Sequence, residues 1–170
     1  MKRLLLLLAI LFTGVLAHSQ EVKYKASFTL NFIRYIGWPE EQTKGEFVIG
    51  VLKNKPLAKL LTEQSTGKKF GFQDIVIKEF ATPAEVTKCQ VLYVGSSVSL
   101  SKYGAELIQN CGGKQFLLIA ESEGATDKGA IINFVLVNDV LKFELSAANA
   151  SKMGLTYSSK LSTMSSAINK

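Results

Sequence analysis

The feature that most constrains the fold is an alternation of short apolar runs and helical patterns between residues 47 and 120. The predicted strands are 47–52, 73–80, 89–95 and 115–120, and the helical patterns between them are 56–64, 82–88 and 100–110. Strands with continuous apolar sequences, such as FVIGVL, are typical of parallel sheets that are buried on both faces. The alternation therefore predicts βαβ units and an α/β fold, with a mostly parallel sheet and helices on both of its faces.

The pattern changes in the last third of the chain. GAIINFVLVNDVLKFELS, at 129–146, reads as two strands joined at Asn138–Asp139, a typical hairpin turn sequence. Apolar and polar positions alternate in its second half, as in an antiparallel strand with one buried and one solvated face. Helical stretches at 147–153 and about 158–168 follow. We therefore expect one domain, 20–170, whose sheet ends in an antiparallel β-hairpin followed by a C-terminal helix.

The first 19 residues have the layout of a secretory signal peptide. Lys2 and Arg3 precede an apolar run at 4–12, and small residues follow, with Ala17 or Ser19 as candidate last residues before cleavage. The apolar run is shorter than the roughly 20 residues that span a bilayer, so an uncleaved anchor is the less favoured reading. A lipid anchor at the junction would need a cysteine there. We expect an exported chain that is not a lipoprotein.

The composition excludes several kinds of active site. The only histidine, His18, lies in the predicted signal peptide, so the mature chain cannot form a Ser-His-Asp triad, a Cys-His dyad or a histidine metal site. Ser-x-x-Lys occurs at Ser65 and Ser99, without the companion motifs of lysine-dependent serine hydrolases. Loss of Lys2 and Arg3 lowers the net charge from +6 to +4, and the remaining basic residues are scattered, unlike a nucleic-acid interface. We therefore expect that the chain is not an enzyme and that it binds no cofactor and no metal ion.

The two cysteines, Cys89 and Cys111, are expected to form a disulfide in an exported protein. Cys89 starts a predicted strand and Cys111 follows the next predicted helix, so both lie at the same edge of the sheet. A bridge closing a loop of about 23 residues would stabilise the fold by about 3 kcal/mol in the chain-entropy model. The alternative is a pair of free, buried thiols.

Polar residues follow the carboxyl ends of several predicted strands, where ligands bind in open α/β sheets. The candidate crevice residues are Lys53, Asn54, Ser96, Ser97 and Glu121. The two serines also precede a predicted helix, whose free N–H groups can hold an anion. The alternative is that these loops are simply solvated and that the serines cap the helix.

The segment KYKASFTLNFIRYIGWP, at 23–39, predicts a helix that ends at Trp38-Pro39 and carries two apolar stripes. The aromatic stripe consists of Tyr24, Phe28, Phe32 and Tyr35, beside an aliphatic stripe that Lys25 alone interrupts. One stripe would seat the helix on its own sheet. The other needs a second partner, either another element of this chain, such as the C-terminal helix, or the interface with another subunit or protein.

The ordered segments KASFTLNFIRYIGWP, FVIGVL, CQVLYVG, GAIINFVLVNDVLKFELS and GLTYSSKLSTM resemble the YfiR-like family. This resemblance implies a dimeric periplasmic regulator, without catalytic residues, that represses a membrane-anchored diguanylate cyclase by binding its periplasmic sensor domain. Such control restrains cyclic-di-GMP signalling and biofilm formation and is tied to disulfide redox state. We expect four cysteines in such repressors, so the two here favour a structural bridge.

We therefore expect a periplasmic regulator that acts by protein–protein contact, with a membrane-anchored signalling protein as partner and a homodimer as its own state. The rival interpretation is a periplasmic receptor that binds a small molecule in the crevice at the strand ends. An enzyme is the third and least favoured reading.

Overall fold

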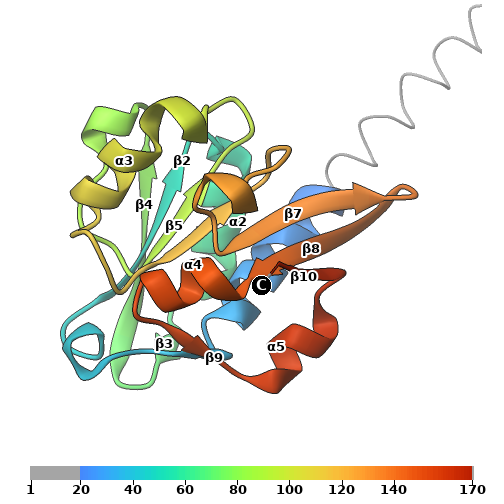
Figure 1. The fold of residues 1–170 in the computed structure, drawn as a ribbon. Coiled ribbons are helices and arrows are strands. Elements are labelled where there is room, and N and C mark those ends of the chain that lie inside the picture. Colours follow the sequence, from blue (N-terminus) through green and yellow to red (C-terminus); the bar gives the residue numbers. More distant parts are fainter. Residues whose placement is uncertain (1–19, 170) are drawn as a thin grey trace, which may run out of the picture.

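A computed structural model of the chain describes residues 20–169, with side chains from 20 to 166 (Figure 1). The predicted signal peptide and its cleavage point lie outside the described residues. Within this part of the chain, no helix is both long enough and apolar enough to cross a membrane.

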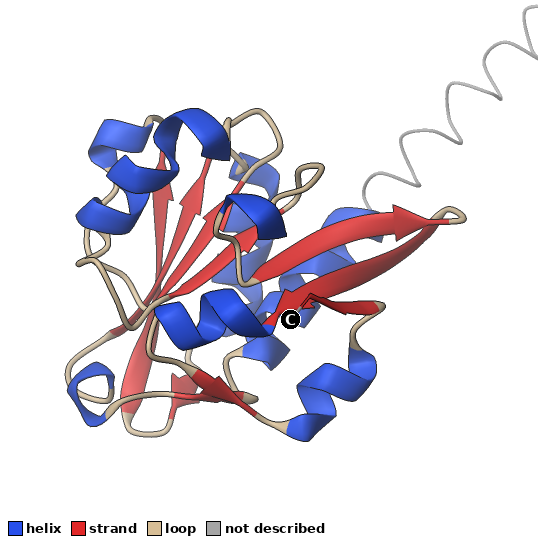
Figure 2. Ribbon diagram, viewed as in Figure 1, coloured by secondary structure: helices blue, strands red, loops and turns tan. Residues whose placement is uncertain are grey.

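The described residues form a mixed α/β fold around an eight-stranded sheet with the order β10-β8-β7-β6-β5-β2-β4-β3 (Figure 2). The strands are β2 (Phe47–Leu52), β3 (Lys69–Phe70), β4 (Gln73–Phe80), β5 (Val91–Val94), β6 (Leu117–Ala120), β7 (Ile132–Val137), β8 (Val140–Ser146) and β10 (Ala167–Asn169). Most neighbours pair in parallel, whereas β7 and β8 form an antiparallel hairpin and β3 pairs antiparallel to β4. The prediction of a mostly parallel sheet that continues into a hairpin is confirmed.

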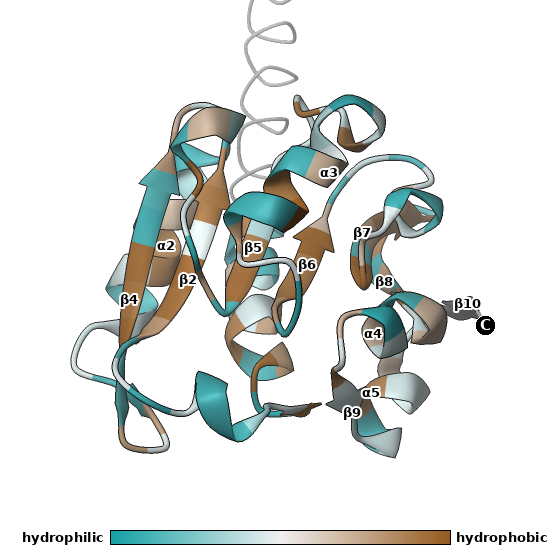
Figure 3. Cartoon of the chain, turned by 60° about the vertical axis from the view of Figure 1, so that its left-hand side comes forward, coloured by the Kyte–Doolittle hydropathy of each residue, from teal (hydrophilic) through white to brown (hydrophobic). Residues whose placement is uncertain are grey.

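The central strands are buried along their whole length, which explains their continuous apolar sequences. Every residue of β2, β5 and β6 is buried, and Figure 3 shows these strands as mainly hydrophobic. β4 lies on one side of β2 and β5 on the other, so the order of the chain reverses between β2 and β5. At this point a side chain on Gly95 would lie 2.7 Å from the carbonyl oxygen of Lys53, so glycine is needed for the close approach.

Two of the three predicted intervening helices are confirmed. α2 (Lys55–Ser65) starts where the Asn54 side chain accepts a hydrogen bond from the Leu57 N–H, and α3 (Leu100–Asn110) ends at Cys111. The helix predicted at 82–88 is wrong, because only the 3₁₀ turn η2 (Pro83–Glu85) forms there. The Glu85 carboxylate accepts hydrogen bonds from the Ala81 N–H and the Thr82 hydroxyl. These bonds close a single turn, after which the backbone is extended at Val86.

The C-terminal segment is more broken than its helical pattern predicts. It contains α4 (Ala147–Lys152), β9 (Thr156–Tyr157) and α5 (Ser159–Met164) before β10. The helix predicted to continue to about 168 stops at Met164, because the Ser166 N–H bonds the Phe143 carbonyl and draws the chain onto β8. β9 pairs with β1 (Ile36–Gly37) just after the N-terminal helix. The remaining short elements are η1 (Glu40–Gln42) and η3 (Thr126–Lys128).

Candidate functional site

The N-terminal helix ends at residue 32, and its predicted end at Trp38-Pro39 is wrong, because a turn follows and the chain then enters β1. The aromatic stripe of this helix packs on the β7–β8 hairpin of the same chain. Phe32 is 0% exposed, and its ring centroid lies 4.8 Å from that of Phe143 and 5.7 Å from that of Phe134. Phe28 stacks on Phe32 at 5.8 Å. The interface prediction for Phe32 is therefore wrong: Phe32 is a core residue, because the hairpin supplies the second partner that the helix requires.

The two tyrosines of the stripe lie at opposite ends of this aromatic cluster. Tyr35 is half-buried, with the ammonium of Lys160 in α5 5.5 Å from its ring centroid, and the Ser158 N–H bonds its carbonyl. Tyr24 is 51% exposed. An interface role remains a prediction for Tyr24, Phe28 and Tyr35, and only Tyr24 presents a large exposed surface.

Tyr24 lies beside an apolar surface on the outer end of the hairpin. Leu136 is 59% exposed and Val140 is 56% exposed, and Val137 is also exposed. A groove of about 650 Å³ joins them to the helix and is lined by Gln20, Glu21, Tyr24, Leu136, Asp139, Val140 and Leu141. We call Tyr24, Leu136, Val137, Val140 and Leu141 the hairpin-tip surface.

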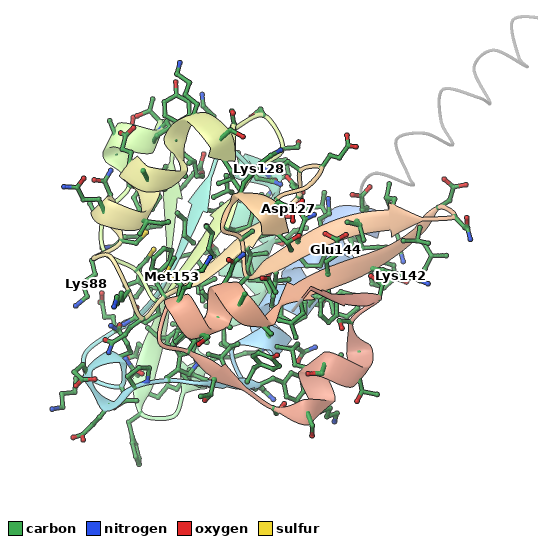
Figure 4. All side chains as sticks on the ribbon, viewed as in Figure 1. Lys88, Asp127, Lys128, Lys142, Glu144 and Met153 are labelled. Carbon is green, nitrogen blue, oxygen red and sulfur yellow. The ribbon has the colours of Figure 1, made fainter. Side chains whose placement is uncertain are left out.

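The hairpin holds this surface away from the rest of the sheet, as Figure 1 shows. Asn138 and Asp139 both have positive φ angles, as a two-residue type I′ turn requires. Figure 4 shows Lys142 and Glu144 on β8, whose predicted alternation of buried and solvated residues is confirmed. The exposure of the hairpin tip was not predicted from the sequence, because INFVLV resembles a strand that is buried along its whole length. The one signal was Val140, an apolar residue on the solvated face of the alternation.

The strand-end crevice contains a network centred on the carboxylate of Glu121, whose side chain is 9% exposed. One oxygen accepts from the Lys25 ammonium at 2.6 Å and from the Tyr93 hydroxyl at 2.7 Å. The other accepts from the Asn54 amide at 2.9 Å and from the Ser96 N–H at 3.2 Å. The structure thus brings together three of the predicted crevice residues, Asn54, Ser96 and Glu121, and Lys25 of the N-terminal helix joins them through Glu121.

The two other predicted crevice residues, Lys53 and Ser97, are exposed and lie outside this network. Sequence reasoning also missed Lys25 and Tyr93 as partners of Glu121. Lys25 did carry a signal, because it alone interrupts the apolar side of the predicted helix, and a charge at such a position needs a buried partner.

The pKa values of Lys25 and Tyr93 show that the network favours the protonated form of both donors. Burial alone would lower the pKa of Lys25, but hydrogen bonds and charge from Glu121 and Glu21 outweigh burial and raise it. Burial, followed by the charge and hydrogen bond of Glu121, raises the pKa of Tyr93 well above its usual range. Glu121 therefore has two donors on each oxygen, one of them the charged ammonium of Lys25, as expected of a structural carboxylate.

A cavity of about 370 Å³ lies next to the network and reaches the hairpin at Phe134 and Leu141. Of the five predicted crevice residues only Glu121 lines this cavity, and the small-molecule crevice stays a prediction. Among the described residues, no group of three or more His, Cys, Asp or Glu side chains could hold a metal ion.

Cys89 and Cys111 are both buried and are present as free thiols, with their sulfur atoms 3.6 Å apart. The hydrogen bond with Cys111, together with burial, raises the pKa of Cys89. The topology thus places the two cysteines side by side, as the strand and helix order predicts. The disulfide itself remains a prediction, which requires the sulfurs to approach to about 2.0 Å.

Comparison with protein families gives one match, to the DUF4154 family, described as YfiR/HmsC-like, over residues 22–166. A search of curated proteins finds no significant match. The matched region includes the N-terminal helix, the sheet and the hairpin, and so contains both the hairpin-tip surface and the Glu121 network.

Proposed function

The chain belongs to the YfiR/HmsC-like family, and from this premise we propose that it is a periplasmic regulator that restrains a membrane-bound diguanylate cyclase by direct contact. The partner surface on the cyclase is its periplasmic sensor domain, and the activity of this protein is binding rather than catalysis. Regulation of this kind would lower cyclic-di-GMP production and biofilm formation.

The hairpin-tip surface is the observation that carries this proposal. Leu136 and Val140 are more than half exposed and share one groove with Tyr24. Contiguous exposed apolar residues mark protein-binding sites, and tyrosine is enriched among residues that dominate binding energy. The proposal takes the sheet as covered by helices on both faces, which the complete burial of β2 and β5 supports. The hairpin tip is then an apolar part of the sheet that stays exposed and available for binding.

The fit of the hairpin base supports a rigid binding surface. Phe134 and Phe143 are held against Phe28 and Phe32 of the N-terminal helix, with ring centroids 4.8–6.3 Å apart. A surface that is already ordered loses little conformational entropy on binding, which favours affinity.

The experiment compares exported variants in cells that contain a membrane-bound diguanylate cyclase with a periplasmic sensor domain. Val140→Glu should raise cyclic-di-GMP to the level of cells that lack this protein, because a charge at the centre of an apolar contact is costly to desolvate. Met164→Glu, at an exposed residue of α5, is the matched control and should leave repression unchanged. Full repression by a folded, exported Val140→Glu chain would contradict the proposal.

We further propose that the exported chain, cleaved after Ala17 or Ser19, is a homodimer in which Cys89 and Cys111 are joined by a structural disulfide. Thiol titration of the unfolded, unreduced mature protein checks the bridge, since the proposal expects no free thiol. Bridge formation should stabilise the fold by about 3 kcal/mol, because it restricts the unfolded chain. Two titratable thiols in protein purified from the periplasm would rule the bridge out.

A further inference from the structure

A second hollow lies at the other end of the N-terminal helix, away from the hairpin-tip surface. It has a volume of about 260 Å³ and lies between this helix, the end of α2 and the β3–β4 hairpin. Its lining residues are Ser27, Leu30, Asn31, Ile33, Arg34, Gln64, Ser65, Lys68, Lys69, Phe70 and Ile75. We call it the basic hollow.

The charged residues of the lining are all cationic: Arg34, Lys68 and Lys69. Lys69 forms an ion pair with Asp74 at 2.7 Å, and Asp74 lies outside the lining. Within the described part of the chain, the side chains of Arg34 and Lys68 have no hydrogen-bond or ion-pair partner. Arg34 and Lys68 are thus two unpaired cations in one concave lining, and they create a positive potential that concentrates anions.

The remaining lining residues supply neutral donors and an apolar floor. The Ser27 hydroxyl lies 3.4 Å from the Gln64 carbonyl oxygen, which leaves the Gln64 amide nitrogen able to donate. Asn31 supplies a second amide. Ile33 is buried, and Leu30, Phe70 and Ile75 are partly buried against the core. A ligand with an anionic head and a short apolar or neutral body fits this combination.

We propose that the basic hollow binds a phosphate monoester, with the guanidinium of Arg34 and the ammonium of Lys68 on the phosphate oxygens. Arginine matches phosphate geometry through paired N–H donors, and lysine contributes a point charge. The amides of Asn31 and Gln64 complete the contacts. This site is independent of the proposed function, since no hairpin-tip residue lines it.

The phosphate monoester could belong to a soluble sugar or glycerol phosphate or to a phospholipid head group, and Phe72 distinguishes these two sources. Phe72 at the β3–β4 turn is 98% exposed, and only Gly71 separates it from the β3 residues Lys69 and Phe70 that line the hollow. A lipid head group in the hollow would place its acyl chains where an exposed phenylalanine can contact them. Binding of a soluble phosphate monoester would not require Phe72.

Binding of glycerol 3-phosphate to the mature chain, measured by calorimetry, tests the shared chemistry. Arg34→Gln should weaken binding by about tenfold, the loss expected for one charge-assisted contact. Lys23→Gln is the matched control, because Lys23 is an exposed residue of the N-terminal helix that precedes Arg34 and lies outside the lining. Affinity should also fall with added salt.

Vesicles of phosphatidylcholine with or without phosphatidic acid provide the second arm, measured by sedimentation. Retention that needs phosphatidic acid, Arg34 and Phe72 supports the site with a lipid source, and Phe72→Ser should then lose the vesicles but keep glycerol 3-phosphate. Binding of glycerol 3-phosphate alone supports the site with a soluble source. The proposal is overturned if neither probe binds, or if Arg34→Gln binds as well as Lys23→Gln.

Discussion

The base and the tip of the β7–β8 hairpin contain similar apolar residues in opposite environments. At the base, Phe134 and Phe143 are buried, whereas at the tip Leu136 and Val140 are more than half exposed. Phe134 pairs with Phe143 in the antiparallel register, and at the tip Leu136 pairs with Leu141 and Val137 with Val140. Coverage explains why Phe134 is buried and Leu136 is exposed on the same face, because Phe28 and Phe32 lie over the base, whereas Gln20, Glu21 and Tyr24 only border an open groove at the tip. Val140 is exposed for a different reason, because it lies on the solvated face of β8, opposite to Phe143.

This comparison separates stability from binding within a single element. Burial of aromatic surface at the base favours folding, at about 25 cal/mol per Å² of apolar surface removed from water. The exposed apolar surface at the tip contributes little to the stability of the isolated chain. Burial of this surface against a partner would instead favour association. Substitutions at the base should therefore change the free energy of unfolding, and those at the tip should change association.

Phe32→Ala should produce the largest loss of stability, about 3–5 kcal/mol, since it leaves a cavity among Phe28, Phe134 and Phe143. Urea denaturation of the mature chain measures the change. Leu136→Ala at the tip is the comparison variant and should change the free energy of unfolding by no more than about 0.5 kcal/mol. Equal losses of unfolding free energy in the two variants would show that the base and the tip contribute equally to stability, contrary to this prediction.

Glu121→Gln should destabilise the chain by about 2 kcal/mol, because it removes one of the two carboxylates, Glu121 and Glu21, that compensate the nearly buried ammonium of Lys25. The same denaturation experiment applies, with Glu123→Gln as control because Glu123 is exposed. This measurement tests whether the helix over the hairpin base is held by the Lys25–Glu121 ion pair as well as by aromatic packing. Similar stability of the two variants would leave aromatic packing as the main attachment.

The network also predicts a loss of stability in alkali. Lys25 and Tyr93 have pKa values raised by folding, so both stay protonated in the folded chain after their unfolded counterparts lose protons, near pH 10.4 and 10. Their contribution is complete below these values and declines above them by up to about 1.4 kcal/mol per pH unit for each group. Unfolding measured from pH 8 to 11 should show a shallower decline in Tyr93→Phe than in the natural chain. Identical slopes would mean that Tyr93 does not contribute.

The smallest effect on folding is expected at the tip itself. Val140→Ser should alter the free energy of unfolding by no more than about 0.5 kcal/mol, because the side chain is largely solvated before and after the change. Thermal denaturation checks this value. A loss above about 2 kcal/mol would indicate that the tip is part of the core, and the proposed binding surface would then have to lie elsewhere.

Part of the candidate site could be predicted from the sequence. The hairpin turn was identified from Asn138–Asp139, and the aromatic stripe correctly implied two partners for the N-terminal helix. Two predictions failed for different reasons. The capping pattern at Thr82–Glu85 closes a single turn rather than a helix, through the local bonds of Glu85. Phe32 faces the hairpin rather than a separate protein, and the sequence could not show this because it depends on which distant segment packs against the helix.

The sequence by itself determined the central strands, the confirmed helices and the hairpin, since each follows from local periodicity, capping or turn chemistry. Only the tertiary structure decided which of these elements meet. Lys25 and Glu121 are separated by 96 positions along the chain and become partners because the fold places the N-terminal helix beside the carboxyl end of β6. The same placement covers Phe134 and exposes Leu136, two residues apart on one strand. Local patterns specify a residue's face of a strand, whereas burial depends on what the rest of the chain places against that face.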